Sequence, residues 1–154
     1  MATRGIRELR ERGIDHEILV YRYNRMGARI AADALGLPHA VVLKSLVFRA
    51  DDGGFLFVLL SGDANVSTRK VGRRTGHKHV EAAVPRDAER ITGYRVGGIS
   101  PLGSRRRLPV ILDETTAAHP HLVVNGGARG TLVRLATGDL VRLTDATIAD
   151  IRTG

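Results

Sequence analysis

The pattern of apolar and polar positions along the chain predicts short strands and five short helices. Apolar residues at helical spacing, bounded by glycine or proline, predict helices over residues 3–12, 27–35, 68–75, 85–92 and 138–144. Apolar runs predict strands over residues 15–22, 41–50, 54–62, 108–113, 121–125 and 131–136, with a short extended piece from residue 80. Because helices do not separate the strands regularly, we expect an α+β domain built on one mixed, strongly curved, barrel-like sheet surrounded by short helices.

Some element boundaries can be assigned to individual residues. The turn at residues 51–54, Asp-Asp-Gly-Gly, tolerates positive φ and predicts a hairpin between two apolar strands, both of them central in the sheet. Ser67 or Thr68 is expected to cap the third helix. Pro85 suits the first turn of the fourth helix.

Lys44 interrupts the apolar run VVLKSLVF and is the most informative residue for function. On a strand it shares a face with Val42, Leu46 and Phe48, and that face should be buried. An ammonium group among apolar neighbours loses hydration unless a partner or a cavity compensates. We therefore expect Lys44 to point into a ligand cavity, where it can hold a phosphate, a carboxylate or a 3′-terminal ribose oxygen. The alternative is a lysine at a strand end that reaches solvent.

A glycine loop, VGGISPLG, follows the fourth predicted helix and is the second candidate site. Gly97 and Gly98 lie beside Ser100 and Pro101, so bare backbone N–H groups can approach a ligand or a developing oxyanion. The alternative is an ordinary tight turn, and the loop matches neither a Walker loop nor a dinucleotide fingerprint. The segment GGARG at residues 126–130 is equally open, because a hairpin turn explains it without a ligand.

Length and composition restrict the class of protein. The 154 residues, 1–154, are expected to form a single compact domain. Cysteine is absent, which excludes disulfides, thiolate zinc sites and a cysteine nucleophile. The amino-terminal segment has no continuous apolar core, and no other window is long enough to span a membrane. We expect a soluble cytoplasmic protein that does not contact membranes.

The formal net charge of +8 favours a polyanionic partner such as nucleic acid or an acidic membrane surface. Few aromatic residues are present, so the stacking platform of a general single-strand binder is missing. Phosphate contacts are predicted from two basic clusters. The first is Arg69, Lys70, Arg73 and Arg74 on the third predicted helix with Lys78 after it, and the second is Arg105, Arg106 and Arg107 after the glycine loop. The alternative for both clusters is a solvated charged face.

Two histidine pairs, His77 with His79 and His119 with His121, have a spacing compatible with zinc. A third ligand is not evident for either pair, and no Ser/His/Asp order stands out. We therefore expect no metal and no cofactor.

Three segments together resemble a known family. The pieces VVLKSLVF, TGYRVGGISPLGSRRRLPVILD and VNGGARG, in this order and at these separations, are similar to the YbaK/prolyl-tRNA-synthetase-associated editing domains, and among these to the YbaK/EbsC branch. The similarity covers nearly the whole chain. It implies an aminoacyl-tRNA deacylase that hydrolyses the ester between a mischarged amino acid and tRNA. In the YbaK branch the substrate is Cys-tRNA(Pro), and the partner is prolyl-tRNA synthetase.

The resemblance also implies roles for individual residues. Lys44 matches the family's active-site lysine, Gly97 matches a glycine whose backbone lines the site, and these two are the predicted catalytic residues. In the YbaK branch the substrate's own thiol attacks its carbonyl, so the protein supplies positioning and electrostatics. The predicted substrate-binding residues are Tyr21, Met26, Ser45, Gly98, Ser100, Pro101, Asn125 and Gly126. The basic clusters are expected to bind the acceptor end of the tRNA.

Three positions depart from the family pattern. Asn125 replaces a usual serine, Leu132 occupies a place where relatives often have an acidic residue, and Met26 replaces an aromatic residue. These positions border the amino-acid pocket, so the resemblance supports deacylation more strongly than it supports cysteine as the amino acid removed. The alternative function is a non-catalytic module that binds tRNA or a synthetase on the same scaffold. A third is a basic protein that binds membranes or nucleic acids without regard to the CCA end.

Overall fold

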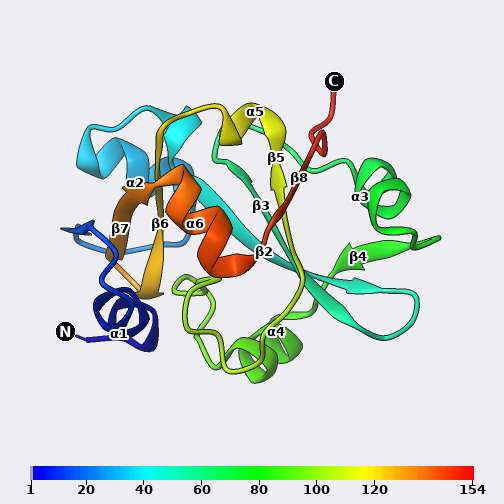
Figure 1. Cartoon of the computed structure of the whole chain (residues 1–154), viewed down its shortest axis with the longest axis horizontal. Coiled ribbons are helices and arrows are strands. Elements are labelled where there is room, and N and C mark those ends of the chain that lie inside the picture. The colour runs from blue at the N-terminus through cyan, green and yellow to red at the C-terminus, as the bar shows by residue number, and fades with distance from the viewer. Residues whose placement is uncertain (1) are drawn as a thin grey trace.

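The structure is a computed structural model that describes residues 2–154 (Figure 1). These residues form one α+β domain with two sheets and short helices. The helices are α1 (Arg4–Glu11), α2 (Ala28–Leu35), α3 (Thr68–Thr75), α4 (Pro85–Thr92), α5 (Glu114–Ala117) and α6 (Thr137–Thr144), with a 3₁₀ turn η1 (His39–Val41). The strands are β1 (His16–Val20), β2 (Leu43–Ala50), β3 (Phe55–Ser61), β4 (Val80–Ala82), β5 (Val110–Asp113), β6 (His121–Ala128), β7 (Thr131–Ala136) and β8 (Thr147–Ala149).

The five helices predicted from the sequence are present, and local chemistry fixes their ends. The side chains of Thr3 and Ser67 accept hydrogen bonds from backbone N–H groups at the starts of α1 and α3. Ser67 is therefore the cap of α3, and Thr68 is its first residue. Helices α3 and α4 end at Gly76 and Gly93, which adopt the left-handed conformation. None of the helices in residues 2–154 has the length and apolar character needed to cross a bilayer.

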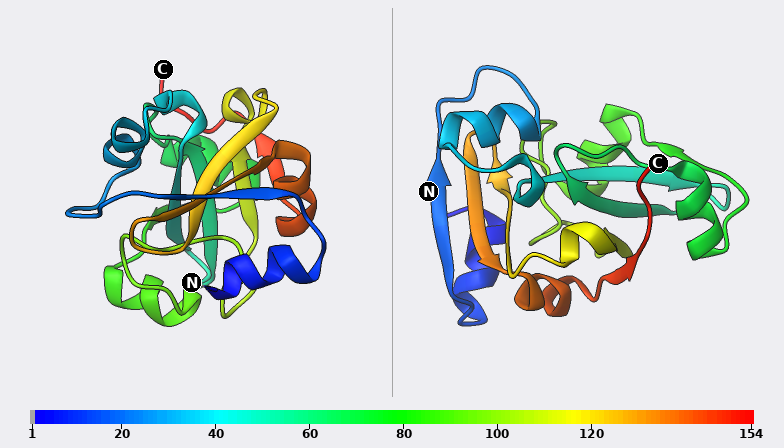
Figure 2. Two further views of the ribbon diagram at one scale, coloured as in Figure 1. Left: turned by 90° about the vertical axis from the view of Figure 1, so that its left-hand side faces the viewer. Right: turned by 90° about the horizontal axis from the view of Figure 1, so that it is seen from above.

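The larger sheet has the strand order β4-β2-β3-β5-β8 and is mixed, as predicted. Strands β2 and β3 form the expected antiparallel hairpin and lie inside this sheet, whereas β3 pairs with β5 and β5 pairs with β8 in parallel. The smaller sheet, β1-β7-β6, is antiparallel. Figure 2 shows its strands running across the direction of β2 and β3.

The predicted barrel-like sheet is wrong, because two sheets replace it and neither is closed or strongly curled. A barrel needs a continuous ladder around the whole sheet. The two sheets meet instead at an isolated parallel bridge between Val42 and Val123. Helix α5 turns the chain out of the larger sheet after β5, before β6 begins. The sequence pattern missed α5, η1 and β8, since each has only three or four residues and shows no period.

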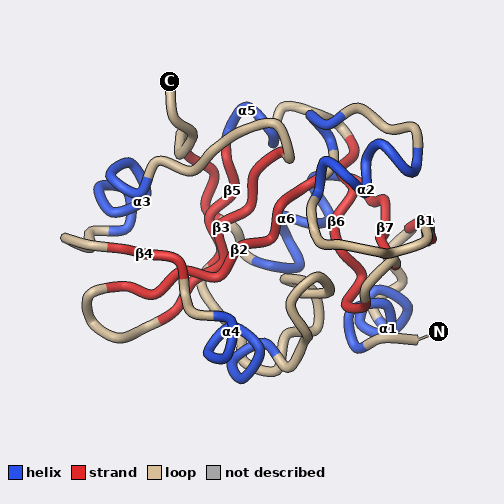
Figure 3. Tube along the Cα trace, turned by 180° about the vertical axis from the view of Figure 1, so that it is seen from behind, coloured by secondary structure: helices blue, strands red, loops and turns tan. Residues whose placement is uncertain are grey.

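Three apolar clusters form the core. The largest fills the space between the sheets, α1, α4 and α6, and the second lies between α3 and the larger sheet. The third lies beneath α2, which is seen beside β6 and β7 in Figure 3. This third cluster consists of Ala31, Ala32, Val42, Val123 and Leu132. The bridge between the two sheets is thus buried under α2.

Replacing the cap of α3 should destabilise the protein. Ser67→Ala removes the acceptor for the N–H of Lys70 and should lower the free energy of unfolding by about 1 kcal/mol. Thr68→Ala is the matched control and should lower it much less. Denaturant unfolding followed by circular dichroism measures both variants, and equal losses would show that Ser67 is not the cap.

Candidate functional site

Lys44 lines a cavity of about 300 Å³ at the start of α2. The cavity walls come from the first turn of α2, from β2 and from the loop between β3 and α3. The lining residues are Gly27, Ala28, Arg29, Ile30, Lys44, Gly62, Asp63 and Asn65. Of the face predicted to be buried, Val42, directly before β2, and Phe48 on β2 are buried, whereas Leu46 is partly buried, as is Lys44 itself.

Groups from the β3–α3 loop compensate the ammonium group of Lys44. Its Nζ donates a hydrogen bond to the carbonyl oxygen of Ala64 (2.5 Å). Burial lowers the pKa of Lys44, the charge of Arg29 lowers it further, and the carboxylate of Asp63 raises it. The pKa of Asp63 is itself lowered, chiefly because the Ser61 hydroxyl donates a 2.7 Å hydrogen bond to its Oδ1. The cavity therefore pairs a lysine that loses its proton more easily than usual with a carboxylate that stays ionised.

Lys44 and Asn125 lie at equivalent positions on two strands that one bridge joins. Val42 pairs in parallel with Val123, and Lys44 and Asn125 each lie two residues further along their strands. Because side chains alternate along a strand, each polar residue shares the face of its valine, and both valines belong to the cluster beneath α2. Asn125 Nδ2 donates to the carbonyl oxygen of Gly97 (3.0 Å). Gly97 does not line the Lys44 cavity, but Asn125 links its loop to the same side of the fold.

The predicted glycine loop is closed by hydrogen bonds within itself. Tyr94 Oη donates to the carbonyl oxygen of Leu102 (2.6 Å), and the N–H of Gly98 donates to that of Arg95 (2.7 Å). Burial raises the pKa of Tyr94, so its hydroxyl remains a donor. Ser100 is fully buried, and its Oγ accepts a hydrogen bond from the N–H of Leu102. The loop is a fixed structure, and Ser100 contributes to its shape.

Arg129 and Tyr23 hold the same loop from outside. Arg129 Nε donates to the carbonyl oxygen of Val96 (2.9 Å), and its guanidinium lies 5.5 Å from the centre of the Tyr23 ring. Gly97 has a φ of +91°, and a Cβ added there would lie 2.4 Å from the Tyr23 hydroxyl oxygen. The glycine is therefore required by both backbone conformation and space. The sequence pattern explained the segment GGARG as a hairpin turn and gave no sign of this contact.

Three further predicted substrate residues, Tyr21, Met26 and Ser45, do not line the Lys44 cavity. Tyr21 packs against the cluster beneath α2, and burial raises its pKa. Met26 is 60% exposed and directly precedes Gly27 of the cavity wall. Ser45 follows Lys44 on β2 and so points to the opposite face, where its buried Oγ has no hydrogen-bond partner within residues 2–154.

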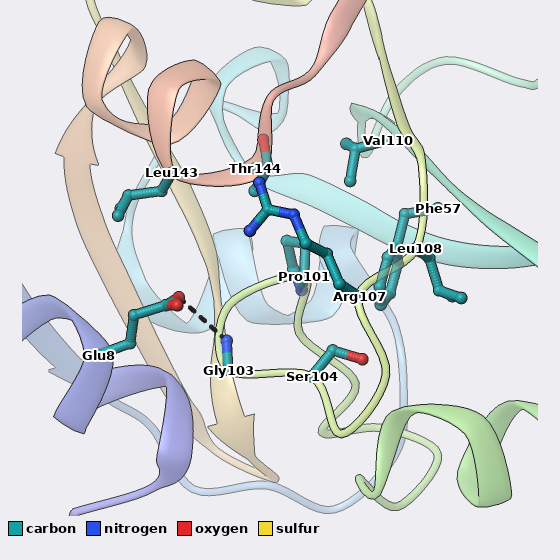
Figure 4. Close-up of a pocket in the computed structure, with 10 residues that line it drawn as sticks. All are labelled: Glu8, Phe57, Pro101, Gly103, Ser104, Arg107, Leu108, Val110, Leu143 and Thr144. Atoms are coloured by element: carbon teal, nitrogen blue, oxygen red, sulfur yellow. Dashed lines mark hydrogen bonds between the residues drawn. The ribbon is translucent and has the colours of Figure 1, made fainter.

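Pro101 lines a second, smaller cavity of about 140 Å³ between the glycine loop, α1 and α6 (Figure 4). Glu8 and Arg107 also line it, and Glu8 Oε1 accepts a hydrogen bond from the N–H of Gly103 (3.2 Å). Gly126 is buried, and its carbonyl oxygen accepts a hydrogen bond from a side chain at the start of α1. Pro101, Arg107 and Gly126, all of them predicted site residues, therefore lie outside the Lys44 cavity.

The predicted basic cluster on α3 contains two kinds of residue. Arg69, Arg73 and Arg74 are exposed, and none of them forms an ion pair within residues 2–154. Lys70 differs, since its Nζ donates to Asp150 Oδ2 (2.9 Å) and to a backbone carbonyl near the C-terminus. Its charge stabilises the fold, whereas the three arginines are available for phosphate.

The second basic cluster, Arg105, Arg106 and Arg107, is exposed on the segment between α4 and β5. The backbone N–H groups of Arg105 and Arg106 donate to carbonyl oxygens of Thr92 and Ile91 in the last turn of α4. This cluster follows the glycine loop, whereas α3 begins just after the loop that walls the Lys44 cavity. The two clusters thus flank different parts of the candidate site.

Sequence reasoning missed Arg29, Asp63 and Asn65, the other charged or amide side chains in the wall of the Lys44 cavity. Asp63 and Asn65 come directly after an apolar strand that ends in a glycine. Polar residues at the end of a strand could have indicated that these two belong to a site. Arg29 had no comparable signal, because one arginine in a short helix is usually a solvated residue.

One group of side chains within residues 2–154 has a spacing compatible with a metal ion. Ligand atoms of Asp51, Asp52 and His77 lie within 4.8 Å of one another, so His77 lies against the hairpin turn, and His79 is not part of this group. Asp51 already accepts hydrogen bonds from His77 Nδ1 (2.9 Å) and from the N–H of Lys78 (3.0 Å). These bonds explain the group as a contact that fixes the hairpin turn.

Known proteins resemble the chain over most of its length. The family model described as "Aminoacyl-tRNA editing domain" matches residues 24–143. EbsC of Enterococcus faecalis, whose name proposes a Cys-tRNA(Pro)/Cys-tRNA(Cys) deacylase, is 29% identical over 130 residues, which are 84% of this chain and 79% of EbsC. Proline–tRNA ligase of Trichlorobacter lovleyi is 33% identical over 82 residues, which are 53% of this chain and only 14% of the ligase.

A solved structure shows the same fold. It is described as a proposed trans-editing enzyme for prolyl-tRNA synthetase, and it superimposes with a TM-score of 0.88 at 30% sequence identity. The superposition covers 98% of this chain and 96% of that one. The whole described architecture, both sheets included, is therefore shared with that protein.

A side chain at position 97 should disturb the glycine loop. Gly97→Ala should lower the free energy of unfolding by about 1–2 kcal/mol, because the residue has positive φ and its Cβ would collide with Tyr23. Gly138→Ala in α6 is the control, since its Cβ would meet its nearest atom at 3.8 Å and alanine favours a helix. Chemical denaturation compares the two, and a Gly97→Ala protein as stable as the Gly138→Ala protein would show that the loop tolerates a side chain.

Proposed function

The chain belongs to the aminoacyl-tRNA editing domain family, a family of deacylases of mischarged tRNA, and we propose that it acts in trans on Cys-tRNA(Pro). The resemblance inferred from the sequence is thus confirmed for the family. The observation that best supports the finer proposal is the position of Lys44, a cation from an apolar strand that lines a cavity with Asp63. The name of EbsC specifies the same type of substrate.

Ester hydrolysis needs groups that stabilise negative charge on the carbonyl oxygen and on the leaving ribose oxygen. Lys44 is suited to the leaving oxygen, because its lowered pKa lets it donate a proton more readily than an ordinary lysine. The N–H of Gly97 forms no hydrogen bond within residues 2–154, whereas its carbonyl oxygen accepts one from Asn125. We assign this N–H to the carbonyl oxyanion.

The attacking group in this proposal belongs to the substrate. The cysteine thiol attacks its own carbonyl carbon, a sulfur–carbon bond forms, and the ester bond to the ribose breaks. The thiol proton is lost, and the ribose oxygen ends protonated. Water then opens the four-membered thiolactone to give free cysteine. The protein then has to orient the aminoacyl end and stabilise charge, which agrees with a chain that contains no cysteine.

The residues that depart from the family pattern favour a small, weakly polar amino acid. Asn125 has both ends of its amide engaged, because Oδ1 accepts a hydrogen bond from the N–H of Gly127 (2.8 Å) and Nδ2 donates to Gly97. Leu132 pairs with Asn125 across the strands and is buried beneath α2. Asn125 and Leu132 therefore offer no free charge to a substrate side chain, which suits cysteine, a small and weakly polar residue. Met26, the third departure from the family pattern, is exposed.

Prolyl-tRNA synthetase is the proposed partner, because an enzyme acting in trans must meet the product of that synthetase before it enters translation. The match to a segment of proline–tRNA ligases supports this choice, since the same type of domain there lies within the ligase chain. The tRNA acceptor end is the proposed recognition element.

A deacylation assay tests the proposed reaction. The protein should release cysteine from Cys-tRNA(Pro) faster than the amino acid from Ala-, Ser- or Pro-tRNA(Pro). Lys44→Ala should lower kcat about 10²-fold, because it removes a charge-stabilising donor. Arg86→Ala changes an exposed cation on α4, outside the cavity and both basic clusters, and should keep the wild-type rate.

Other outcomes would contradict this proposal in different ways. Turnover of none of the charged tRNAs, together with tight tRNA binding, would support the non-catalytic binding module. Equal rates for the wild type and Lys44→Ala would exclude Lys44 from the chemistry. Faster release of another amino acid would retain the reaction and change the specificity.

Salt dependence of binding tests the tRNA contacts. Arg73→Ala and Arg74→Ala should each weaken tRNA binding and reduce the slope of log K against log salt by about 1, because each removes a phosphate contact. Arg142→Ala on α6 is the control, since Arg142 pairs with Asp139. Filter binding with intact and CCA-trimmed tRNA gives both quantities. Equal affinity for intact and CCA-trimmed tRNA would support a general basic surface that does not recognise the CCA end.

A further inference from the structure

Residues 150–153, near the C-terminus, pair with the β3–α3 loop, which forms part of the wall of the Lys44 cavity. The N–H of Ser67 donates to the carbonyl oxygen of Ile151 (2.8 Å), and the N–H of Thr153 donates to that of Asn65 (2.9 Å). These two bonds surround an antiparallel bridge between the loop and the segment. The cavity wall is therefore held by residues from the far end of the chain.

Arg152 anchors this segment to a buried carboxylate. Its Nε and Nη2 both donate to Oδ2 of Asp113, at 2.9 and 2.7 Å. Asp113 is fully buried at the end of β5, and it also accepts hydrogen bonds from the N–H and the hydroxyl of Thr116. A buried carboxylate requires such partners, so the position of Arg152 is tightly determined.

Arg152 also fixes the direction of a hydrogen bond to Ser61. Its Nη2 donates to Ser61 Oγ (3.1 Å), and because arginine has only donors, Ser61 can only accept in this contact. The single hydroxyl hydrogen of Ser61 is left for its other partner. That partner is Asp63, whose Oδ1 lies 2.7 Å from Ser61 Oγ.

We propose that Arg152 is a positioning residue of the site, which acts through the Ser61 hydroxyl to hold the Asp63 carboxylate at the Lys44 cavity. The effect on turnover rests on the proposed function, whereas the hydrogen-bond arrangement is measurable without a substrate. Arg152 itself does not line the cavity and is not a catalytic residue.

The pKa of the Asp63 carboxyl group depends on this arrangement and can be measured. The Ser61 hydrogen bond lowers the pKa of Asp63 most, and the positive charges of Arg152 and His39 lower it further. Loss of the Ser61 hydroxyl, or of its orientation, should therefore raise that pKa. The charged groups around Asp63 come from several elements and are Lys44 on β2, Arg29 on α2, His39 on η1, Asp113 on β5 and Arg152 near the C-terminus.

Two variants separate the hydrogen bond from the stability of the fold. Ser61→Ala removes the hydroxyl and leaves the pair between Arg152 and Asp113 intact. Arg152→Lys keeps the charge but loses the planar fork that reaches both partners. Arg142→Lys on α6 is the matched control, because Arg142 pairs with Asp139 at the surface. Circular dichroism establishes that each variant is folded.

Carbon-13 NMR titration of the aspartate carboxyl groups is the decisive measurement. The pKa of Asp63 should rise in Ser61→Ala and in Arg152→Lys, and it should be unchanged in Arg142→Lys. The double variant of Ser61 and Arg152 should match Ser61→Ala, because the two residues act through one bond. An unchanged Asp63 pKa in Ser61→Ala would overturn the assigned hydrogen bond, and an effect of Ser61→Ala alone would overturn the role of Arg152.

The deacylation assay gives the functional readout. If ionised Asp63 is needed beside Lys44, the raised pKa in both variants moves the acid limb of the kcat profile to higher pH, with KM little changed. A pH profile identical to that of the wild type would exclude a positioning role. A wild-type protein without deacylase activity would refute the proposed function, while the NMR titration would still decide the arrangement of Arg152, Ser61 and Asp63.

Discussion

The position of one ammonium group on an otherwise apolar strand determines how the surrounding structure is built. Lys44 loses hydration on β2, and the structure compensates with the carbonyl oxygen of Ala64 and the carboxylate of Asp63. Both groups belong to the β3–α3 loop, so that loop has to be held in place. Hydrogen bonds to residues 150–153 hold it, and Arg152 ties that segment to β5. The cavity thus depends on segments from most of the chain.

The junction between the two sheets provides the space for the site. The sheets meet at the single bridge between Val42 and Val123, and their strands diverge beyond it. A closed barrel would fill this region with paired backbone, whereas the open junction leaves Lys44 at a cavity beside the start of α2. Asn125 then connects the cavity side of the fold to the glycine loop. Two parts that are far apart in sequence therefore meet through one amide side chain.

The basic residues divide into those that stabilise the fold and those that remain free. Arg152 and Lys70 pair with acidic groups, and Arg129 holds the glycine loop by a hydrogen bond to Val96. The arginines exposed on α3 and after the glycine loop are among those available to an anionic partner. Fewer basic side chains are therefore free for binding than the 24 lysines and arginines of the sequence.

The sequence by itself determined the elements whose signals lie within a few residues: the capped helices, the central hairpin, the glycine loop, a lysine on an apolar strand, and membership of the editing-domain family. Tertiary structure alone decided that the strands form two open sheets, because α5 and β8 are too short to show a period. It also decided which groups surround Lys44. Arg152 and Ser61 are 91 residues apart, and no local pattern specifies a contact over that separation. Such contacts arise only when the topology of the sheets brings the end of the chain back to the cavity wall.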